Sequence, residues 1–220
     1  NLFLNAKADV NFVHQSTGAT SLWFATAQGY TDIVRQLLKA KAKVNIFNEG
    51  RLTPLFMATM DDNIEIVRML LESKADPNLV PDGGMAPLFE ATNNGNVEIV
   101  RLLLKANANV NYTWEHGRTS LMVAALHGNT EIVKLLLNAN ANVNSVDEAG
   151  ATPLLLASDQ GHIDIVKLLL NANALVDIET EYGDSPLSQA MKNGHNDIVK
   201  LLLNAESHPD VSYSNNLNFN

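Results

Sequence analysis

The 220-residue chain contains no cysteine. This absence excludes disulfide bonds, thiolate zinc sites and cysteine nucleophiles, and it is compatible with a reducing compartment. The chain also lacks an apolar run of about 18 residues or more, so no membrane-spanning helix is expected. Its first residues show neither the basic nor the long apolar segment of a secretory signal, which favours a cytoplasmic protein.

Positive charge is scarce as well. The chain has 15 lysine and arginine residues against 24 acidic ones, which gives a formal net charge of −9. Nucleic-acid binding depends on lysine and arginine, so this balance argues against such a ligand. It favours a protein partner with a basic or mixed basic and apolar surface. Hydrophobic residues make up 46% of the chain, enough for a packed core, and we expect a soluble monomer.

Catalytic and cofactor motifs are also missing. The sequence contains no P-loop, no G-x-S-x-G motif, no H-E-x-x-H motif and no dinucleotide-binding fingerprint. Its glycines recur at a regular spacing and do not cluster around a phosphate. We therefore expect no enzymatic activity, no cofactor and no metal.

Internal repetition is what the chain has in abundance, with a step of 33 residues. One column of the repeat consists of alanines: Ala25, Ala58, Ala91, Ala124, Ala157 and Ala190. A second column consists of isoleucines that are each followed by valine: Ile33, Ile66, Ile99, Ile132, Ile165 and Ile198. Two independent columns of six members predict six units of the same structure.

Each unit has the order turn, helix, loop, helix. Three first helices begin with a hydroxyl N-cap before a proline, whose missing N–H costs nothing at that position: Thr53 with Pro54, Thr152 with Pro153, and Ser185 with Pro186. Second helices carry the pattern I-V-x-L-L-L, most regularly in residues 128–144. There, Asn140 is a residue type that tolerates a left-handed helix cap.

These motifs resemble ankyrin repeats, with G-x-T-P-L at residues 150–154 and G-H-x-D-I-V-K-L-L-L at residues 161–170. The resemblance implies an all-α repeat solenoid of stacked helix-turn-helix units with projecting β-hairpin-like turns. We expect a partial unit at residues 1–11, units starting near residues 18, 51, 84, 117, 150 and 183, and an irregular tail at residues 206–220. Family resemblance also implies that repeat asparagines such as Asn45 and Asn144 could be hydroxylated.

Several positions depart from the family pattern. Arg51 stands where a turn glycine belongs, and Asp62 replaces the glycine that ends a first helix. The first turn is one residue longer than its equivalents. We therefore expect distorted turns in the first two units. Residues 2–8 have the pattern of the end of a second helix, and little cover is expected for Trp23 and Phe24.

The resemblance implies a concave groove of turn tips and first helices in which a partner binds. The residues predicted to face the partner are Phe47, Glu49, Met60, Met85, Trp114, Glu115, His116, Arg118, Leu126, His127, Glu148, Asp159 and Tyr182. Trp114 and Arg118 are of the types that most often dominate binding energy. Trp114 also stands where the family usually has an aspartate that stabilises the turn. The alternative is that Trp114 folds back onto a neighbouring turn.

Histidines and paired charges have plainer interpretations. His116 and His127 could face the groove, but no third ligand is spaced to complete a metal site. His162 and His195 are predicted to be structural. On the second helices, each Lys or Arg of one column follows an Asp or Glu three residues earlier, which predicts i, i+3 ion pairs on a solvated face.

The favoured hypothesis is a non-catalytic scaffold that binds another protein through this groove. An alternative is the substrate-docking part of a larger enzyme or of a secreted effector that acts in a host cytosol. A third is metal or small-molecule binding through His116 and His127.

Overall fold

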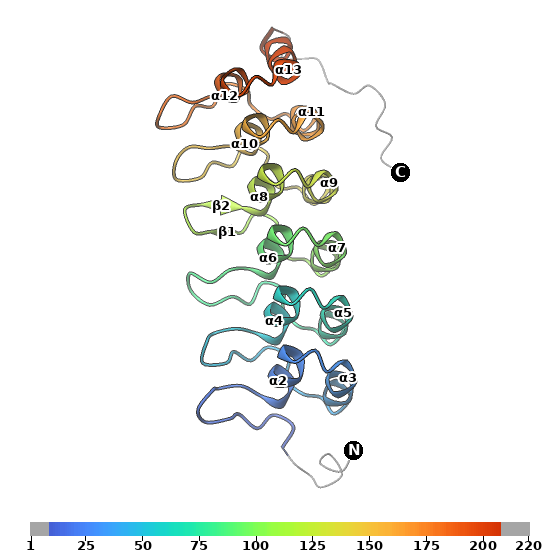
Figure 1. Ribbon diagram of the computed structural model, residues 1–220. Coiled ribbons are helices and arrows are strands. Elements are labelled where there is room, and N and C mark those ends of the chain that lie inside the picture. The colour runs from blue at the N-terminus through green and yellow to red at the C-terminus, as the bar shows by residue number, and fades with distance from the viewer. Residues whose placement is uncertain (1–8, 208–220) are drawn as a thin grey trace. The chain divides into compact units, whose positions relative to one another are not determined.

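Twelve helices form six consecutive pairs in residues 9–207, the part of the chain that the computed structural model describes (Figure 1). The pairs divide between two compact structural units, which are larger than the 33-residue repeats. From here on, unit 1 is the part of the chain that ends at Asn109, and unit 2 is the part that begins at Val110. Unit 1 contains α2 (Ser21–Ala27), α3 (Thr31–Lys39), α4 (Pro54–Met60), α5 (Ile64–Glu72), α6 (Pro87–Asn93) and α7 (Val97–Lys105). Unit 2 contains β1 (Thr113–Trp114), β2 (Arg118–Thr119), α8 (Ser120–Leu126), α9 (Thr130–Asn138), α10 (Pro153–Asp159), α11 (Ile163–Asn171), α12 (Pro186–Lys192) and α13 (Asn196–Ser207). The predicted all-α repeat solenoid is confirmed.

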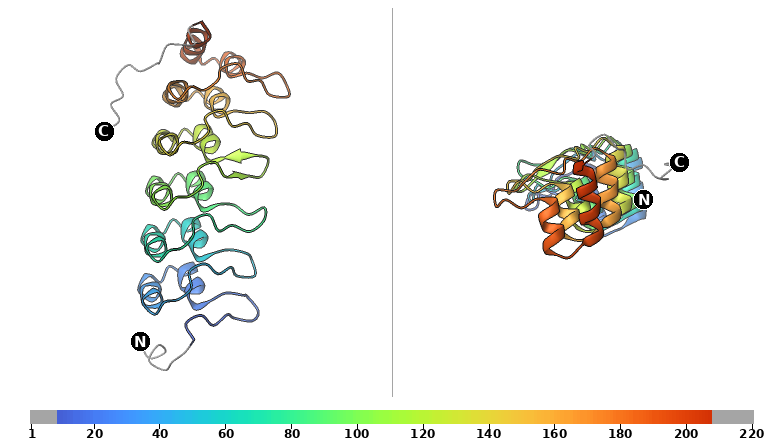
Figure 2. Two further views of the ribbon diagram at one scale, coloured as in Figure 1. Left: turned by 180° about the vertical axis from the view of Figure 1, so that it is seen from behind. Right: turned by 90° about the horizontal axis from the view of Figure 1, so that it is seen from above.

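Within each unit, first helices pack on first helices and second helices pack on second helices. The turns that precede the first helices extend from the row of first helices, away from the second helices (Figures 1 and 2). We number these turns one to six: residues 11–19, 45–52, 78–85, 111–118, 144–151 and 177–184. They lie where a partner could reach them without disturbing the helix packing.

The two repeated columns form the core. Ala58 and Ala91 are fully buried, and only a small side chain lets neighbouring first helices approach so closely. Ile66 and Ile99 are fully buried too, whereas Ile33 in the first described pair is 48% exposed. Phe24 is exposed, as predicted, but Trp23 is half-buried because its Nε1 donates to the carbonyl of Leu52 at 3.1 Å.

The helix boundaries follow the predicted capping residues. Thr53, Thr152 and Ser185 accept a hydrogen bond from the third helical amide, and each is followed by proline at the first helical position. Asn140 is left-handed with φ of 63°, as predicted, and Asp62 takes the place of a terminating glycine with φ of 51°. Helix α13 continues to Ser207 and so includes the first two residues of the predicted tail.

Asparagine side chains join each turn to the following repeat. Asn45 Oδ1 accepts from the amide of Asp76 at 2.9 Å, and its Nδ2 donates to the carbonyl of Lys74, a left-handed residue, at 3.4 Å. We call this arrangement the asparagine bridge. The same two bonds are made by Asn78 to Asn107 and Asn109, by Asn111 to Asn140 and Asn142, and by Asn144 to Asn173 and Leu175. One side chain thus satisfies two backbone groups that the helix cap leaves free.

The first turn is longer than the others, as predicted. Asn11 Oδ1 accepts from the amide of Lys43, 32 residues later, whereas the other bridges span 31. The extra residue lies in the loop that the bond from the His14 amide to the Ala19 carbonyl closes at 2.9 Å.

The prediction of a distorted second turn is wrong. The amide of Arg51 donates to the carbonyl of Asn48 at 2.9 Å, and in the regular fifth turn the amide of Gly150 donates to Asp147 at the same distance. Arg51 adopts a φ of 60°, close to the 83° of Gly150. The arginine therefore accepts the left-handed backbone of a glycine position, and the turn keeps its shape.

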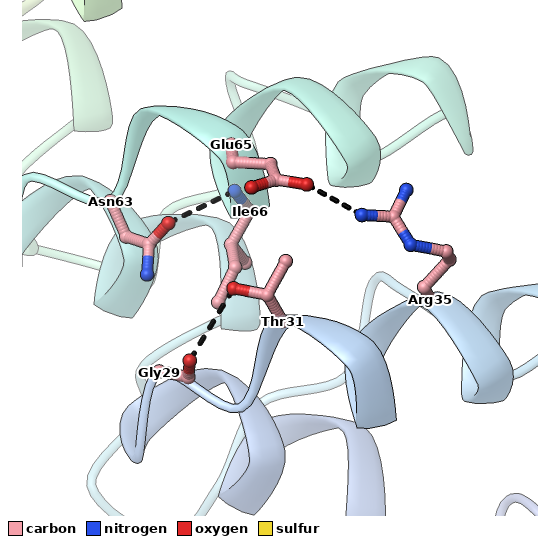
Figure 3. Close-up of polar contacts among 6 residues, drawn as sticks. All are labelled: Gly29, Thr31, Arg35, Asn63, Glu65 and Ile66. Atoms are coloured by element: carbon pink, nitrogen blue, oxygen red, sulfur yellow. Dashed lines mark hydrogen bonds and ion pairs between the residues drawn. The ribbon is translucent and has the colours of Figure 1, made fainter.

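Ion pairs on the second helices follow two patterns. The predicted i, i+3 pairs form between Lys167 and Asp164 at 3.5 Å and between Lys200 and Asp197 at 3.0 Å, among others. Arg35 and Arg68 differ, because each reaches the glutamate of the next repeat: Glu65 and Glu98 respectively. Figure 3 shows Arg35 of α3 pointing toward Glu65 of α5. All these groups are largely exposed, so each pair contributes at most about 1 kcal/mol.

Residues 1–8 of the predicted partial repeat at residues 1–11, and residues 208–220 of the predicted tail, lie outside the described residues.

Replacing Asn144 by alanine should lower the free energy of unfolding by about 0.5–1.5 kcal/mol, because the Leu175 amide and the Asn173 carbonyl, both exposed, exchange their protein partner for water. Urea unfolding followed by circular dichroism measures this. Asn138→Ala is the control, since Asn138 is exposed at the end of α9. Equal losses in the two variants would contradict a structural role for the bridge.

Arg51→Gly should raise the free energy of unfolding by about 1 kcal/mol, since a left-handed backbone is costly for a residue with a Cβ. The reverse control is Gly183→Ala. Gly183 has a φ of 78° and open space around an added Cβ, so this variant should lose a similar amount of unfolding free energy. Thermal unfolding of both variants tests the pair, and a destabilised Arg51→Gly variant would show that the arginine stabilises the fold.

Candidate functional site

Turn four carries the largest group of predicted partner-binding residues. Its two short strands pair antiparallel, with Trp114 opposite Arg118. Arg118 is exposed and Trp114 is half-buried. Strand β2 runs directly into α8, and Thr119 caps that helix by accepting from the amide of Met122 at 3.3 Å. The hairpin is thus held firmly on its helix.

Trp114 differs from its counterparts in the way its turn is stabilised. In turns two, five and six the equivalent residues accept hydrogen bonds from their own turn: Asn48 from the Leu52 amide at 2.8 Å, Asp147 from the Ala151 amide at 2.9 Å, and Thr180 from the Asp184 amide at 3.1 Å. An indole has no acceptor and cannot do this. Strand pairing replaces the missing bond in turn four.

His116 and Glu148, predicted separately, are brought together. Nδ1 of His116 donates to Oε2 of Glu148 at 2.9 Å, and the Glu148 amide donates to the His116 carbonyl at 2.8 Å. Both side chains are more than two-thirds exposed, so the contact between them adds little stability. Together with the backbone bond, it connects the tips of turns four and five. Glu115 and Tyr182, also predicted, are exposed on turns four and six.

The ends of the first helices in unit 2 hold three more predicted residues. His127 is exposed at the end of α8, and the carbonyl of the half-buried Leu126 accepts from Nε2 of His162 at 3.1 Å. The Asp159 carbonyl accepts in the same way from His195 at 3.0 Å. The prediction that His162 and His195 are structural is supported by these bonds between successive repeats.

Four predicted residues lie in unit 1. Glu49 in turn two and Met60 at the end of α4 are exposed, whereas Phe47 in turn two and Met85 in turn three are half-buried. Phe47 and Met85 line the same small pocket, with a volume of about 40 Å³, between turns two and three. This pocket was not predicted, because it depends on how two different turns face each other.

Glu90 was also missed by the prediction. It lies on α6 in a column that is apolar in neighbouring repeats: Met57, Val123 and Leu156. Burial raises the pKa of Glu90 above its ordinary value of 4.5; a hydrogen bond from Asn94 opposes this shift, and the charge of Asp62 adds to it. The sequence did carry a signal for Glu90, because it is a single carboxylate in an otherwise apolar column. A carboxylate that is half-desolvated on this face is suited to binding a cation.

Charge is unequal between the units. Residues 1–109 contain 11 acidic and 10 basic residues, and residues 110–220 contain 13 acidic and 5 basic ones. Unit 2 therefore carries most of the net negative charge. Within residues 9–207, no three His, Asp or Glu side chains gather as a metal site, and every helix is too short or too polar to cross a membrane.

The fold and surface define a class of protein built from stacked helix pairs with exposed turn tips. The sequence profile described as ankyrin repeats (3 copies) matches residues 1–81, 79–147 and 139–213. The chain belongs to the ankyrin repeat family, whose members are generally protein–protein interaction modules. No match was found among curated proteins.

Glu90→Gln should stabilise the protein at neutral pH. A carboxyl whose folded pKa is raised favours the folded state fully below its unfolded pKa, and this contribution is lost as the pH rises above 4.5 through the folded pKa. The stability difference between variant and wild type should therefore be largest near pH 7 and vanish below about pH 4. Urea unfolding across this range measures it, with Glu181→Gln on the exposed tip of turn six as the charge-matched control. A difference that does not change with pH would contradict the assignment.

Proposed function

We propose that this chain is a non-catalytic interaction module that binds a partner protein through turn tips and first helices, with turn four of unit 2 as its centre. The observation that carries the proposal is the pairing of Trp114 with Arg118 on a hairpin held on α8. A hairpin that is already ordered loses little backbone freedom on binding, and aromatic and arginine side chains commonly dominate interface energies.

Acidic residues support a partner with a basic or mixed basic and apolar surface. Glu115, Glu148, Glu179 and Glu181 are exposed on turns four, five and six of the more acidic unit. Such a surface attracts basic partners and speeds their association more than it increases affinity. The apolar part of the contact would fall to Trp114 and Leu126. We infer a monomeric, cytoplasmic protein that neither binds nucleic acid nor inserts into a membrane.

The test compares tagged wild-type protein with a Trp114→Ala, Arg118→Ala double variant in quantitative pulldown from cells of the source. A protein captured by the wild type is then purified, and its affinity is measured by calorimetry. The double variant should bind it at least about 30-fold more weakly, as expected when two dominant contacts are lost.

The control removes two cations from the second helices with Lys134→Ala and Lys167→Ala, which should leave binding unchanged. Circular dichroism verifies that every variant is folded. Unchanged affinity in the double variant, or an equal loss in the control, would overturn the assignment of this surface.

A further inference from the structure

A pocket in unit 1 has the properties of a site for one apolar side chain. It lies between turns two and three and has a volume of about 40 Å³. Its lining is mostly apolar and includes Phe47, Phe56, Leu79, Pro81 and Met85. Arg51 is the one charged residue of the lining, and it is exposed at the rim.

The pocket occurs where the regular contact between successive turns is interrupted. The Glu49 amide in turn two donates to Thr17 in turn one at 2.8 Å, and the Glu148 amide makes the same bond in unit 2. Asp82 is the equivalent residue of turn three, and across residues 9–207 its amide makes no such backbone bond. The two turns are therefore not closed against each other at this point.

Turn three is built around Pro81. Proline has no N–H, so Pro81 cannot donate across its turn as Asn48 does to Leu52 in turn two. Gly84 packs directly against it, because a Cβ added there would lie 2.5 Å from Pro81 Cγ. The rigid proline and the glycine packed against it give the third turn a fixed shape. The pocket is therefore preformed.

The volume limits what can enter. An apolar cavity of about 150 Å³ holds a benzene ring, so a pocket of about 40 Å³ is too small for an aromatic side chain. A terminal methyl group of valine, leucine or isoleucine fits this size. The apolar lining favours such a group over a polar one.

Arg51 adds a charge preference. Within the described chain its guanidinium forms no ion pair, whereas Arg35 and Arg68 of the same unit pair with carboxylates. It also adopts a left-handed backbone at a position where turns five and six have glycine. A cation kept at a conformational cost beside an apolar pocket is suited to a carboxylate that accompanies the apolar side chain.

We propose that this pocket binds a partner segment in which a valine, leucine or isoleucine is adjacent to an aspartate or glutamate. The aliphatic side chain enters between Phe47 and Met85, and the carboxylate pairs with Arg51. The inference rests on the proposed function as an interaction module. It assigns a second contact, in unit 1, to an acidic and apolar element of a partner.

The experiment titrates isotopically labelled full chain with N-acetyl-leucyl-aspartyl amide and follows amide and methyl NMR signals. Saturable shifts are expected at Leu52, Leu79 and Met85. N-acetyl-leucyl-lysyl amide should bind about three- to fivefold more weakly, as expected for one exposed ion pair. Replacing leucine by serine or phenylalanine in the probe should weaken binding further, because the first cannot fill the pocket and the second cannot enter it.

Three variants sharpen the result. Arg51→Gly should abolish the preference for the aspartyl over the lysyl probe, and its expected gain in stability excludes unfolding as the cause. Arg118→Ala removes the same charge from turn four and should leave the preference intact. Met85→Ala enlarges the pocket and should shift selectivity from leucine toward phenylalanine.

The proposal is overturned if no saturable shifts appear up to the solubility limit of the probe. It is also overturned if the shifts lie away from turns two and three, or if Arg51→Gly keeps the preference for the aspartyl probe. The probe needs no partner protein and can be repeated on the Trp114→Ala, Arg118→Ala variant. Failure at this pocket therefore leaves the turn-four surface untouched, and failure of that surface leaves the pocket testable.

Discussion

The asparagine bridge is the interaction on which the stacking of repeats in each unit depends. Every second helix before the last is followed by a left-handed residue, and the asparagine of the preceding turn accepts from the amide two residues further on. In turns two to five the same asparagine also donates to the carbonyl of the left-handed residue. The side chain must offer a donor and an acceptor at a fixed reach. Aspartate lacks the donor, and glutamine is one carbon longer. The amide bonds of turns two to five each span 31 residues, and the extra residue of the first turn lies within the segment that the Asn11 bond closes.

Because the bridges and the buried columns hold the repeats together, the side chains at the turn tips are not needed for the stacking. Their side chains can vary without loss of the stack, and they do vary. The energetic cost of a departure at a tip is local, on the order of 1 kcal/mol, as at the left-handed Arg51. Stability and recognition are thus assigned to different parts of the same repeat.

The sequence predicted the repeats, their capping residues and the left-handed Asn140 because all of these follow from local chemistry repeated at a constant step. It did not predict the Arg35–Glu65 pair, the His116–Glu148 contact or the pocket beside Met85. Each of these depends on the distance between side chains of neighbouring repeats, which a periodic pattern does not encode. The expected distortion at Arg51 failed for another reason: a missing glycine was equated with a changed backbone, although arginine can adopt the same backbone at some cost.

One position of the repeat contributes a residue to each of the two candidate binding surfaces, the pocket between turns two and three and the hairpin of turn four. Asn48, Asp147 and Thr180 each accept hydrogen bonds from their own turn, and the same column holds Pro81 in turn three and Trp114 in turn four. Neither of these residues can supply the acceptor. Turn three relies on proline rigidity packed against Gly84, and turn four relies on strand pairing. A self-stabilising polar residue has thus been exchanged twice for an apolar one, with a different compensation each time. Both exchanges give up a hydrogen bond within the turn, and the proposed contacts with a partner give one reason for them.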